Sequence, residues 1–260
     1  MRPDVSELHA FYETPLGVVA RRLLRRALRR LWPDIHGQSL LGLGYATPYL
    51  GVFREEAERT LALMPASQGV MAWPAHEARL VALSEETDIP LPDGSIDRVL
   101  LVHALEFTEE SRELLREVWR VMSGSARLLI LVPNRAGLWA RTERSPFGQG
   151  RPFSPSQLGQ LLRETQFTPT SYRCALYLPP TRSRLLLRLA SPLERLIGRF
   201  SPPIGGVILI EAAKQVYAVR PERRRALRRR LYVPVPGGGV PAGARVPLPS
   251  PRSLGEPRPL

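Results

Sequence analysis

Short apolar runs alternate with amphipathic stretches along the first 219 residues of the chain. The runs are rich in Leu, Val and Ile, which is typical of buried strands, whereas the amphipathic stretches repeat their apolar residues at helical spacing. The predicted strands are Ser39–Leu43, Thr60–Met64, Arg79–Leu83, Arg98–Val102, Leu128–Val132, Gln166–Leu178 and Gly206–Val219, and the predicted helices are residues 14–32, Thr47–Arg59, Glu109–Met122, Ser154–Glu164 and 182–199.

Several predicted helices carry recognisable end signals. Thr47 precedes Pro48, which places a capping side chain before a proline in the first turn. Thr108 is the predicted cap of the next helix, and Gly124 is predicted to end that helix in a left-handed conformation. The fourth helix is predicted to begin with a capping box at Ser154–Gln157.

Strands that alternate with helices predict an α/β fold with a doubly wound, mainly parallel sheet and helices on both faces, and so three layers. In such sheets, ligands bind beyond the carboxyl ends of the strands, near the switch in strand order. The expected organisation is an N-terminal extension (1–13), one domain (14–219) that opens with an N-terminal helix, and a basic Pro/Gly-rich tail (220–260). The tail is expected to be disordered, because its composition buries too little apolar surface to offset the entropy of ordering.

The chain has a formal net charge of +13, and the distribution of that charge limits what it implies. Lys214 is the only lysine, so 36 of the 37 basic residues are arginine, a bias that favours a GC-rich genome as its cause. From Arg220 onward, ten Arg and two Glu give 10 − 2 = +8, which leaves 13 − 8 = +5 for the preceding 219 residues. The high charge is therefore largely a property of the tail.

One cysteine, Cys174, excludes an internal disulfide, and no metal site is predicted. Cys174 lies in a predicted strand and is expected in the core. The chain has no run of 18 apolar residues, so no membrane-spanning helix is expected. Its first residues lack the apolar core of a secretory signal, and a cytoplasmic location is expected.

Small residues follow the first predicted strand, where a bound nucleotide needs a close approach to the backbone. Gly42, Gly44 and Ala46 alternate there, although an ordinary tight turn after a strand gives the same pattern. The second strand ends at Met64, and Gln68 is the first amide side chain after it.

Polar side chains follow the next two strands. Glu85 and Glu86 come after the third strand, and His103 ends the fourth. Strand ends of this kind line ligand sites, but a solvated acidic loop and a structural histidine are the alternatives. The long loop Pro133–Phe153 combines arginines with aromatic rings, which suits either an acidic or planar substrate or a plain surface lid. Its candidate substrate residues are Asn134, Arg135, Trp139, Phe147 and Arg151.

The segment Glu85–Asn134 closely resembles the second half of a class I S-adenosylmethionine (SAM) methyltransferase domain. It has the family's order of acidic loop, buried strand, capped helix, glycine and second buried strand, and its DIPLPDGSID is similar to the family's segment before the fourth strand. The chain also resembles a bacterial subfamily of type-11-like methyltransferases over about Phe11 to Tyr217. The resemblance rests on the segments WPA (73–75), VPNR (132–135) and PFGQGRPFS (146–154). The resemblance implies a Rossmann-like, seven-stranded sheet and SAM as cofactor.

The resemblance also implies roles for individual residues. Met64 stands where the family has the acid that accepts both ribose hydroxyls, and this loss is expected to cost about 2–4 kcal/mol of affinity, with Gln68 as a weaker substitute. Gly42 stands where an acid usually precedes the glycines, and no catalytic base is identified. The implied cofactor-binding positions are Gly42, Gly44, Ala46, Met64, Glu85, Glu86 and His103, with Glu85 at the adenine amino group.

Three functions remain open from the sequence. The first is a SAM-dependent methyltransferase that positions an unknown acceptor against the sulfonium. The second is a non-catalytic protein that keeps the methyltransferase fold as a binding module or scaffold. The third is a basic protein that contacts RNA or an anionic membrane through Arg21–Arg30 and Arg223–Arg230, although the leucine stripe of the helix 14–32 favours packing on the sheet.

Overall fold

The computed structural model describes residues 2–76, 78–143, 145–200 and 202–215, which belong to one compact unit, Met1–Tyr217. The predicted tail 220–260, with its arginine cluster Arg223–Arg230, lies outside the described residues. Among the described helices, none has the length and apolar character needed to cross a membrane.

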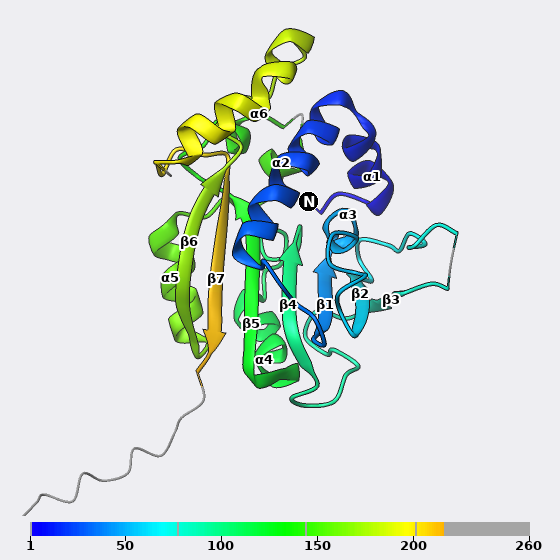
Figure 1. Cartoon of the computed structure of the whole chain (residues 1–260). Helices are drawn as coiled ribbons and strands as arrows, with labels where there is room; N and C mark the ends of the chain where they lie inside the picture. The colour runs from blue at the N-terminus through cyan, green and yellow to red at the C-terminus, as the bar shows by residue number, and fades with distance from the viewer. Residues whose placement is uncertain (1, 77, 144, 201, 216–260) are drawn as a thin grey trace, which may run out of the picture. The chain divides into compact units, whose positions relative to one another are not determined.

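A seven-stranded sheet forms the centre of the fold, in the order β3-β2-β1-β4-β5-β7-β6 (Figure 1). Neighbouring strands are parallel, except that β7 is antiparallel to both β5 and β6. The predicted three-layer, mainly parallel fold is confirmed. The strands are β1 (Ser39–Gly44), β2 (Arg59–Pro65), β3 (Val81–Ser84), β4 (Ile96–Val102), β5 (Met122–Pro133), β6 (Phe167–Ala175) and β7 (Val207–Lys214).

Helices cover both faces of the sheet (Figure 1). Leu115 of α4 and Leu158 of α5 belong to the buried cluster on one face, and Leu24 and Leu28 of α2 belong to the cluster on the other. The leucine stripe of α2 therefore packs into the core, as its spacing favours. The helices are α1 (Val5–Glu13), α2 (Pro15–Leu31), α3 (Thr47–Leu50), α4 (Ser111–Val121), α5 (Pro155–Glu164) and α6 (Arg184–Gly198), with short 3₁₀ turns η1 (Trp139–Arg141) and η2 (Pro146–Gly148).

The helix predicted from Thr47 to Arg59 was wrong in length and in its cap. Only α3 is helical, and its N-cap is Ala46, which makes no side-chain hydrogen bond. Gly51 ends the helix, consistent with its low helix propensity. Successive turns then bring the ring of Phe53 against Trp32, with ring centroids 5.7 Å apart.

The predicted ends of α4 also needed correction. The N-cap is Glu110, and the Thr108 hydroxyl instead accepts a hydrogen bond from the Glu110 N–H at 3.2 Å. Gly124 does not end the helix, because the chain becomes extended already at Met122 and enters β5 without a turn. The Met122 N–H still bonds to Val118 O, so the last helical turn is closed while the strand begins.

Asp97 joins the amino-terminal ends of three strands. Its carboxylate accepts hydrogen bonds from the Ser39 N–H at 3.0 Å, the Ser39 hydroxyl at 2.8 Å and the Ser123 hydroxyl at 2.9 Å. Burial raises the pKa of Asp97, but these hydrogen bonds outweigh it and leave the pKa below its ordinary value. The ionised form is therefore the one that the fold stabilises.

We expect Asp97→Asn to lower the free energy of unfolding at neutral pH by about 1–3 kcal/mol. Because the folded pKa is depressed, the stabilisation is present above the unfolded pKa and is lost as the pH falls through the folded one. Urea unfolding at neutral pH and at pH values below the ordinary pKa of Asp measures both effects. The gap between wild type and variant should narrow in acid, and a constant gap would contradict this role. Asp88→Asn, at an exposed residue, is the control.

Candidate functional site

The carboxyl ends of β1, β2, β3 and β4 meet at one edge of the sheet, because these strands run parallel. β1 lies between β2 and β4, so the strand order switches direction there, which is where this class of sheet binds ligands. The loops after Pro65, Ser84 and Val102 therefore converge on the turn that follows Gly44. The helix α1 lies at the same edge (Figure 1).

The small residues of this turn meet other parts of the protein at close range. Gly44 has φ +75°, and a Cβ there would lie 2.3 Å from Val102 O. The next N–H, of Tyr45, donates to the same oxygen at 2.8 Å. A Cβ on Gly42 would lie 2.7 Å from a methyl of Leu50, and Ala46 is buried. Close packing of the turn on β4 and α3 thus accounts for the small residues at these positions.

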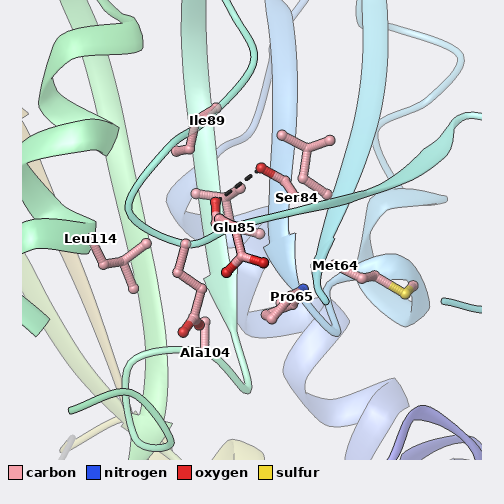
Figure 2. A pocket seen from close by; sticks show the side chains of 11 residues that line it. Met64, Pro65, Ser84, Glu85, Ile89, Ala104 and Leu114 are labelled. Atoms are coloured by element: carbon pink, nitrogen blue, oxygen red, sulfur yellow. Dashed lines mark hydrogen bonds between the residues drawn. The ribbon is translucent and has the colours of Figure 1, made fainter. Parts of the chain in front are cut away.

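A small cavity lies between the ends of β1, β2 and β3 (Figure 2). It contains about 10 Å³ of space, far below the several hundred Å³ typical of a site for a drug-sized ligand. The cavity brings together four of the predicted cofactor residues, Gly44, Met64, Glu85 and Glu86, whereas Gly42, Ala46 and His103 are not part of its lining.

His103 is fully buried at the end of β4 and takes a left-handed backbone conformation, with φ 52°. Its Nδ1 lies 3.1 Å from a carboxylate oxygen of Glu106, and its Nε2 lies 2.8 Å from the hydroxyl of Tyr12. That hydroxyl also lies 2.8 Å from the hydroxyl of Tyr49. Burial raises the pKa of Tyr12 well above its ordinary value, so its phenol stays protonated.

The N-terminal segment 2–13 spans this edge and touches two predicted cofactor residues. The Arg2 guanidinium donates to Glu86 at 2.6 Å and to the Ser67 hydroxyl at 2.6 Å. At the other end of the segment, Tyr12 reaches His103. Sequence reasoning treated residues 1–13 only as an extension and missed both contacts. The signal for a packed helix was present, since Val5, Leu8, Phe11 and Tyr12 recur at helical spacing after the N-cap Asp4, and all four are buried.

Three loops at this edge hold buried polar atoms that have no partner among the described residues. Both amide atoms of Gln68 after β2, one carboxylate oxygen of Glu86 after β3 and one of Glu106 after β4 are in this state. Buried polar groups are nearly always hydrogen-bonded, so these unpaired atoms leave hydrogen-bonding capacity at three neighbouring strand ends. Glu86 contacts the N-terminal segment directly, through Arg2. Glu106 is linked to the same segment through His103, which lies against Tyr12.

The predicted substrate residues of the loop after β5 lie in two environments. Asn134 is buried and donates to the carbonyls of Pro203 and Gly205, at 2.8 and 2.7 Å. Trp139 and Phe147 are also buried, and the Phe147 ring lies 4.9 Å from the ring of His103. Arg135 and Arg151 are exposed. The aromatic rings of the loop therefore pack next to His103, while its arginines Arg135 and Arg151 face solvent.

A larger hollow, of about 210 Å³, is lined in part by Tyr12. Arg25 is half-buried there and donates its Nε to Pro48 O at 2.6 Å, without a carboxylate partner among the described residues. Burial and the nearby Arg21 lower the pKa of Arg25, because both disfavour its positive charge. An anionic group bound beside Arg25 would offset that cost. The hollow is lined mainly by His9, Tyr12, Glu13, Arg21, Arg25, Tyr45, Met71 and Trp73.

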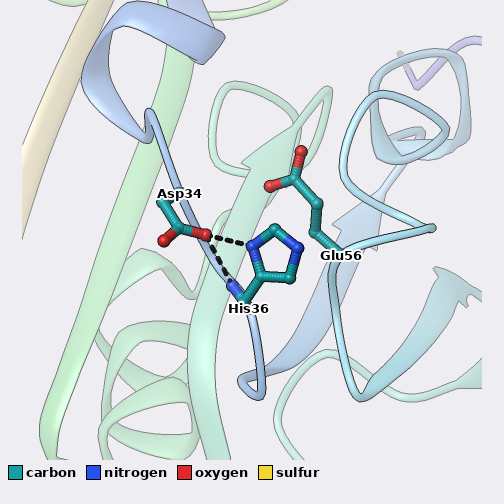
Figure 3. Close-up of side chains that lie close together, drawn as sticks. All are labelled: Asp34, His36 and Glu56. Carbon is teal, nitrogen blue, oxygen red and sulfur yellow. Dashed lines mark hydrogen bonds and ion pairs between the residues drawn. The ribbon is translucent and has the colours of Figure 1, made fainter.

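One further cluster has the donor types of a metal site, at the opposite end of β1 (Figure 3). Ligand atoms of Asp34, His36 and Glu56 all lie within 4.8 Å of one another. However, Arg29 forms a two-bond ion pair with the Glu56 carboxylate, and His36 Nδ1 lies 2.5 Å from Asp34. These pairs occupy both oxygens of Glu56, Nδ1 of His36 and Oδ1 of Asp34, so an exposed ion-pair network explains the cluster.

The domain is similar to known proteins. A family model described as a methyltransferase domain matches residues 41–130. An uncharacterised protein of Mycobacterium tuberculosis is 25% identical over 190 residues, which are 70% of this chain and 64% of that protein. The chain thus spans 64% of the length of this relative.

Solved structures with the same fold include a SAM-dependent methyltransferase of Thermotoga maritima, with a TM-score of 0.57, 16% identity and coverage of 81% of this chain and 96% of that one. The [4+2]-cyclase SpnF also shares the fold, with a TM-score of 0.52, 21% identity and coverage of 76% and 81%. The likeness to these structures establishes the fold, which by itself leaves the reaction open. Together with the domain match, it supports a methyltransferase-like domain with the fold of class I SAM-dependent methyltransferases.

Proposed function

We propose that this chain is a SAM-dependent methyltransferase whose cofactor site lies beneath the N-terminal segment 2–13. The observation that carries the proposal is the set of unpaired polar atoms on Gln68, Glu86 and Glu106, which lie on the loops after β2, β3 and β4, at the sheet edge where this fold is expected to bind SAM. SAM offers an amine, two ribose hydroxyls and an amino-acid group, which are partners of the kind that these atoms lack.

The residues at the edge fit SAM only when the N-terminal segment moves. The cavity of about 10 Å³ is too small for a nucleoside. Arg2 and Tyr12 also form hydrogen bonds with Glu86 and His103, the groups that SAM would need. Displacing the segment would release a carboxylate next to the adenosine end and an imidazole next to the methionine end. The ribose would meet Met64 and Gln68, so its hydroxyls would bind to an amide instead of an acid.

The chemistry supplied by bound SAM is an electrophilic methyl group, and the protein mainly has to hold the acceptor in line with it. We assign the acceptor to the hollow beside Tyr12, because the half-buried Arg25 there lacks an anionic partner among the described side chains. An acceptor with an anionic group fits this charge. In the tautomer of His103 that donates its Nδ1–H to the Glu106 carboxylate, Nε2 would be able to accept a proton once Tyr12 has moved.

A second function, a non-catalytic binding or scaffold protein, is favoured by the same closed geometry. Met64 is almost fully buried at the position of the ribose acid, and the Arg2–Glu86 pair closes the edge without a ligand. The two functions differ in whether SAM binds at all.

Glu85→Ala tests the assigned register. Glu85 lines the cavity and is the predicted acceptor of the adenine amino group, so its loss should weaken SAM binding about tenfold or more while leaving the fold intact. Titration calorimetry measures the affinity, and circular dichroism checks the fold. Glu113→Ala, at an exposed residue of α4, is the matched control and should leave the affinity unchanged. Equal affinities for Glu85→Ala and wild type would show that Glu85 does not bind the adenine.

A further inference from the structure

The helix α6 has two apolar faces, and only one of them packs on the protein. Leu187 and Ala190 are buried, and Glu194 also points inward, where its carboxylate accepts hydrogen bonds from the N–H groups of Leu176 and Tyr177 at 2.7 and 3.0 Å. The opposite face carries a stripe of exposed apolar side chains at spacings of four and seven residues: Leu185, Leu189, Leu196 and Phe200.

This outer stripe is unusually exposed for its size. Leu185 is 67% exposed and Phe200, just beyond the helix, is 79% exposed, and Ile204 adds another exposed apolar side chain nearby in the sequence. Soluble surfaces carry single exposed apolar residues, whereas a continuous row indicates an interaction surface. The helix extends beyond the sheet at the end of the molecule where α1 lies (Figure 1).

A row of arginines borders the stripe. Arg184, Arg188, Arg195 and Arg199 are exposed and recur at helical spacing beside it. Residues 181–206 hold five Arg and one acid, the inward-facing Glu194, a net of 5 − 1 = +4. On the neighbouring helix, Arg22 joins Arg184 and Arg188 in lining an open groove of about 480 Å³.

We propose that this surface, the outer face of α6 with its arginine row, binds an anionic lipid membrane. An amphipathic helix that lies in the interface inserts its apolar side chains between the lipids while arginines contact the phosphate headgroups. A second copy of the chain fits poorly, because a symmetric contact through this face would bring two arginine rows together without acids to pair them. With 15 residues, α6 is suited to lie along the membrane surface.

Vesicle co-sedimentation of the full chain tests the proposal, with phosphatidylcholine vesicles that contain or lack phosphatidylserine. The decisive variant replaces Leu185, Leu189, Leu196 and Phe200 with Gln, which removes the apolar stripe and keeps every charge. We expect binding to the anionic vesicles to fall about tenfold or more. Leu83→Gln with Leu138→Gln, at exposed leucines outside this surface, should bind like wild type.

The basic residues of the tail need a separate variant, because they also attract anionic lipid. In a protein whose six arginines of Arg223–Arg230 are replaced with Gln, most of the binding to anionic vesicles should remain. The α6 substitutions should still lower that binding. The proposal is overturned if the α6 variant binds as tightly as wild type, or if the tail variant alone abolishes binding. It is also overturned if the wild-type protein does not bind the vesicles and light scattering shows a dimer that the α6 substitutions dissociate.

Discussion

Gly44→Ala is expected to destabilise the fold by about 2–5 kcal/mol, a large part of the stability of a typical domain. Two costs combine at this residue. The backbone has φ +75°, which disfavours any residue with a Cβ, and the new methyl group would lie 2.3 Å from Val102 O. The turn cannot move away from that oxygen without breaking the bond from the Tyr45 N–H to it, at 2.8 Å.

Gly37→Ala is a matched control for the backbone cost alone. Gly37 has φ +66°, but a Cβ there meets nothing within 4 Å, so this variant should lose only about 1–2 kcal/mol. Urea unfolding of both variants separates the two terms. If Gly44→Ala were no less stable than Gly37→Ala, close packing of the turn against β4 would not be what requires glycine at this position.

Tyr12→Phe is expected to raise the affinity for SAM roughly 10- to 100-fold. The substitution leaves Nε2 of His103 buried without its partner, which costs about 1–3 kcal/mol only while the N-terminal segment is docked. Destabilising the docked state raises the fraction of molecules whose N-terminal segment is undocked. The apparent affinity of a ligand that binds only the undocked form rises by the same factor. The same substitution should lower the stability of the ligand-free protein.

Tyr172→Phe is the control for Tyr12→Phe. The Tyr172 hydroxyl lies 2.8 Å from the Cys174 sulfur on β6, away from the cofactor edge, so its loss should leave SAM affinity unchanged. Titration calorimetry on the two variants and wild type makes the comparison. Weaker SAM binding by Tyr12→Phe would mean that Tyr12 contacts the cofactor, and that the N-terminal segment belongs to the site instead of closing it.

The sequence predicts the sheet well because each strand carries its own signal. The apolar runs that became β1, β2, β4 and β5 are continuous, and burial on both faces of a parallel sheet produces that pattern directly. Local signals were less reliable where the tertiary structure decides the outcome. Gly124 looks like a helix stop but lies inside β5, since the pairing of Met122 with Ile96 draws the chain into the sheet.

The site was only partly predictable for a similar reason. Gly44, Met64, Glu85 and Glu86 meet at one cavity because they sit at the ends of adjacent parallel strands, which the strand order implies. Arg2 and Tyr12 reach this edge across 84 and 91 residues of chain, to Glu86 and His103. Contacts over such separations depend on how α1 folds back, which no local pattern encodes.

Titration calorimetry of the full chain with SAM, and with its demethylated product, is the most direct test of the proposed function. We predict binding at micromolar ligand, accompanied by a rise in the melting temperature. The heat should include a contribution from releasing the Arg2–Glu86 and Tyr12–His103 contacts. No heat and no thermal shift at millimolar ligand would contradict the account, and would favour the second function, a methyltransferase fold that serves as a binding module or scaffold.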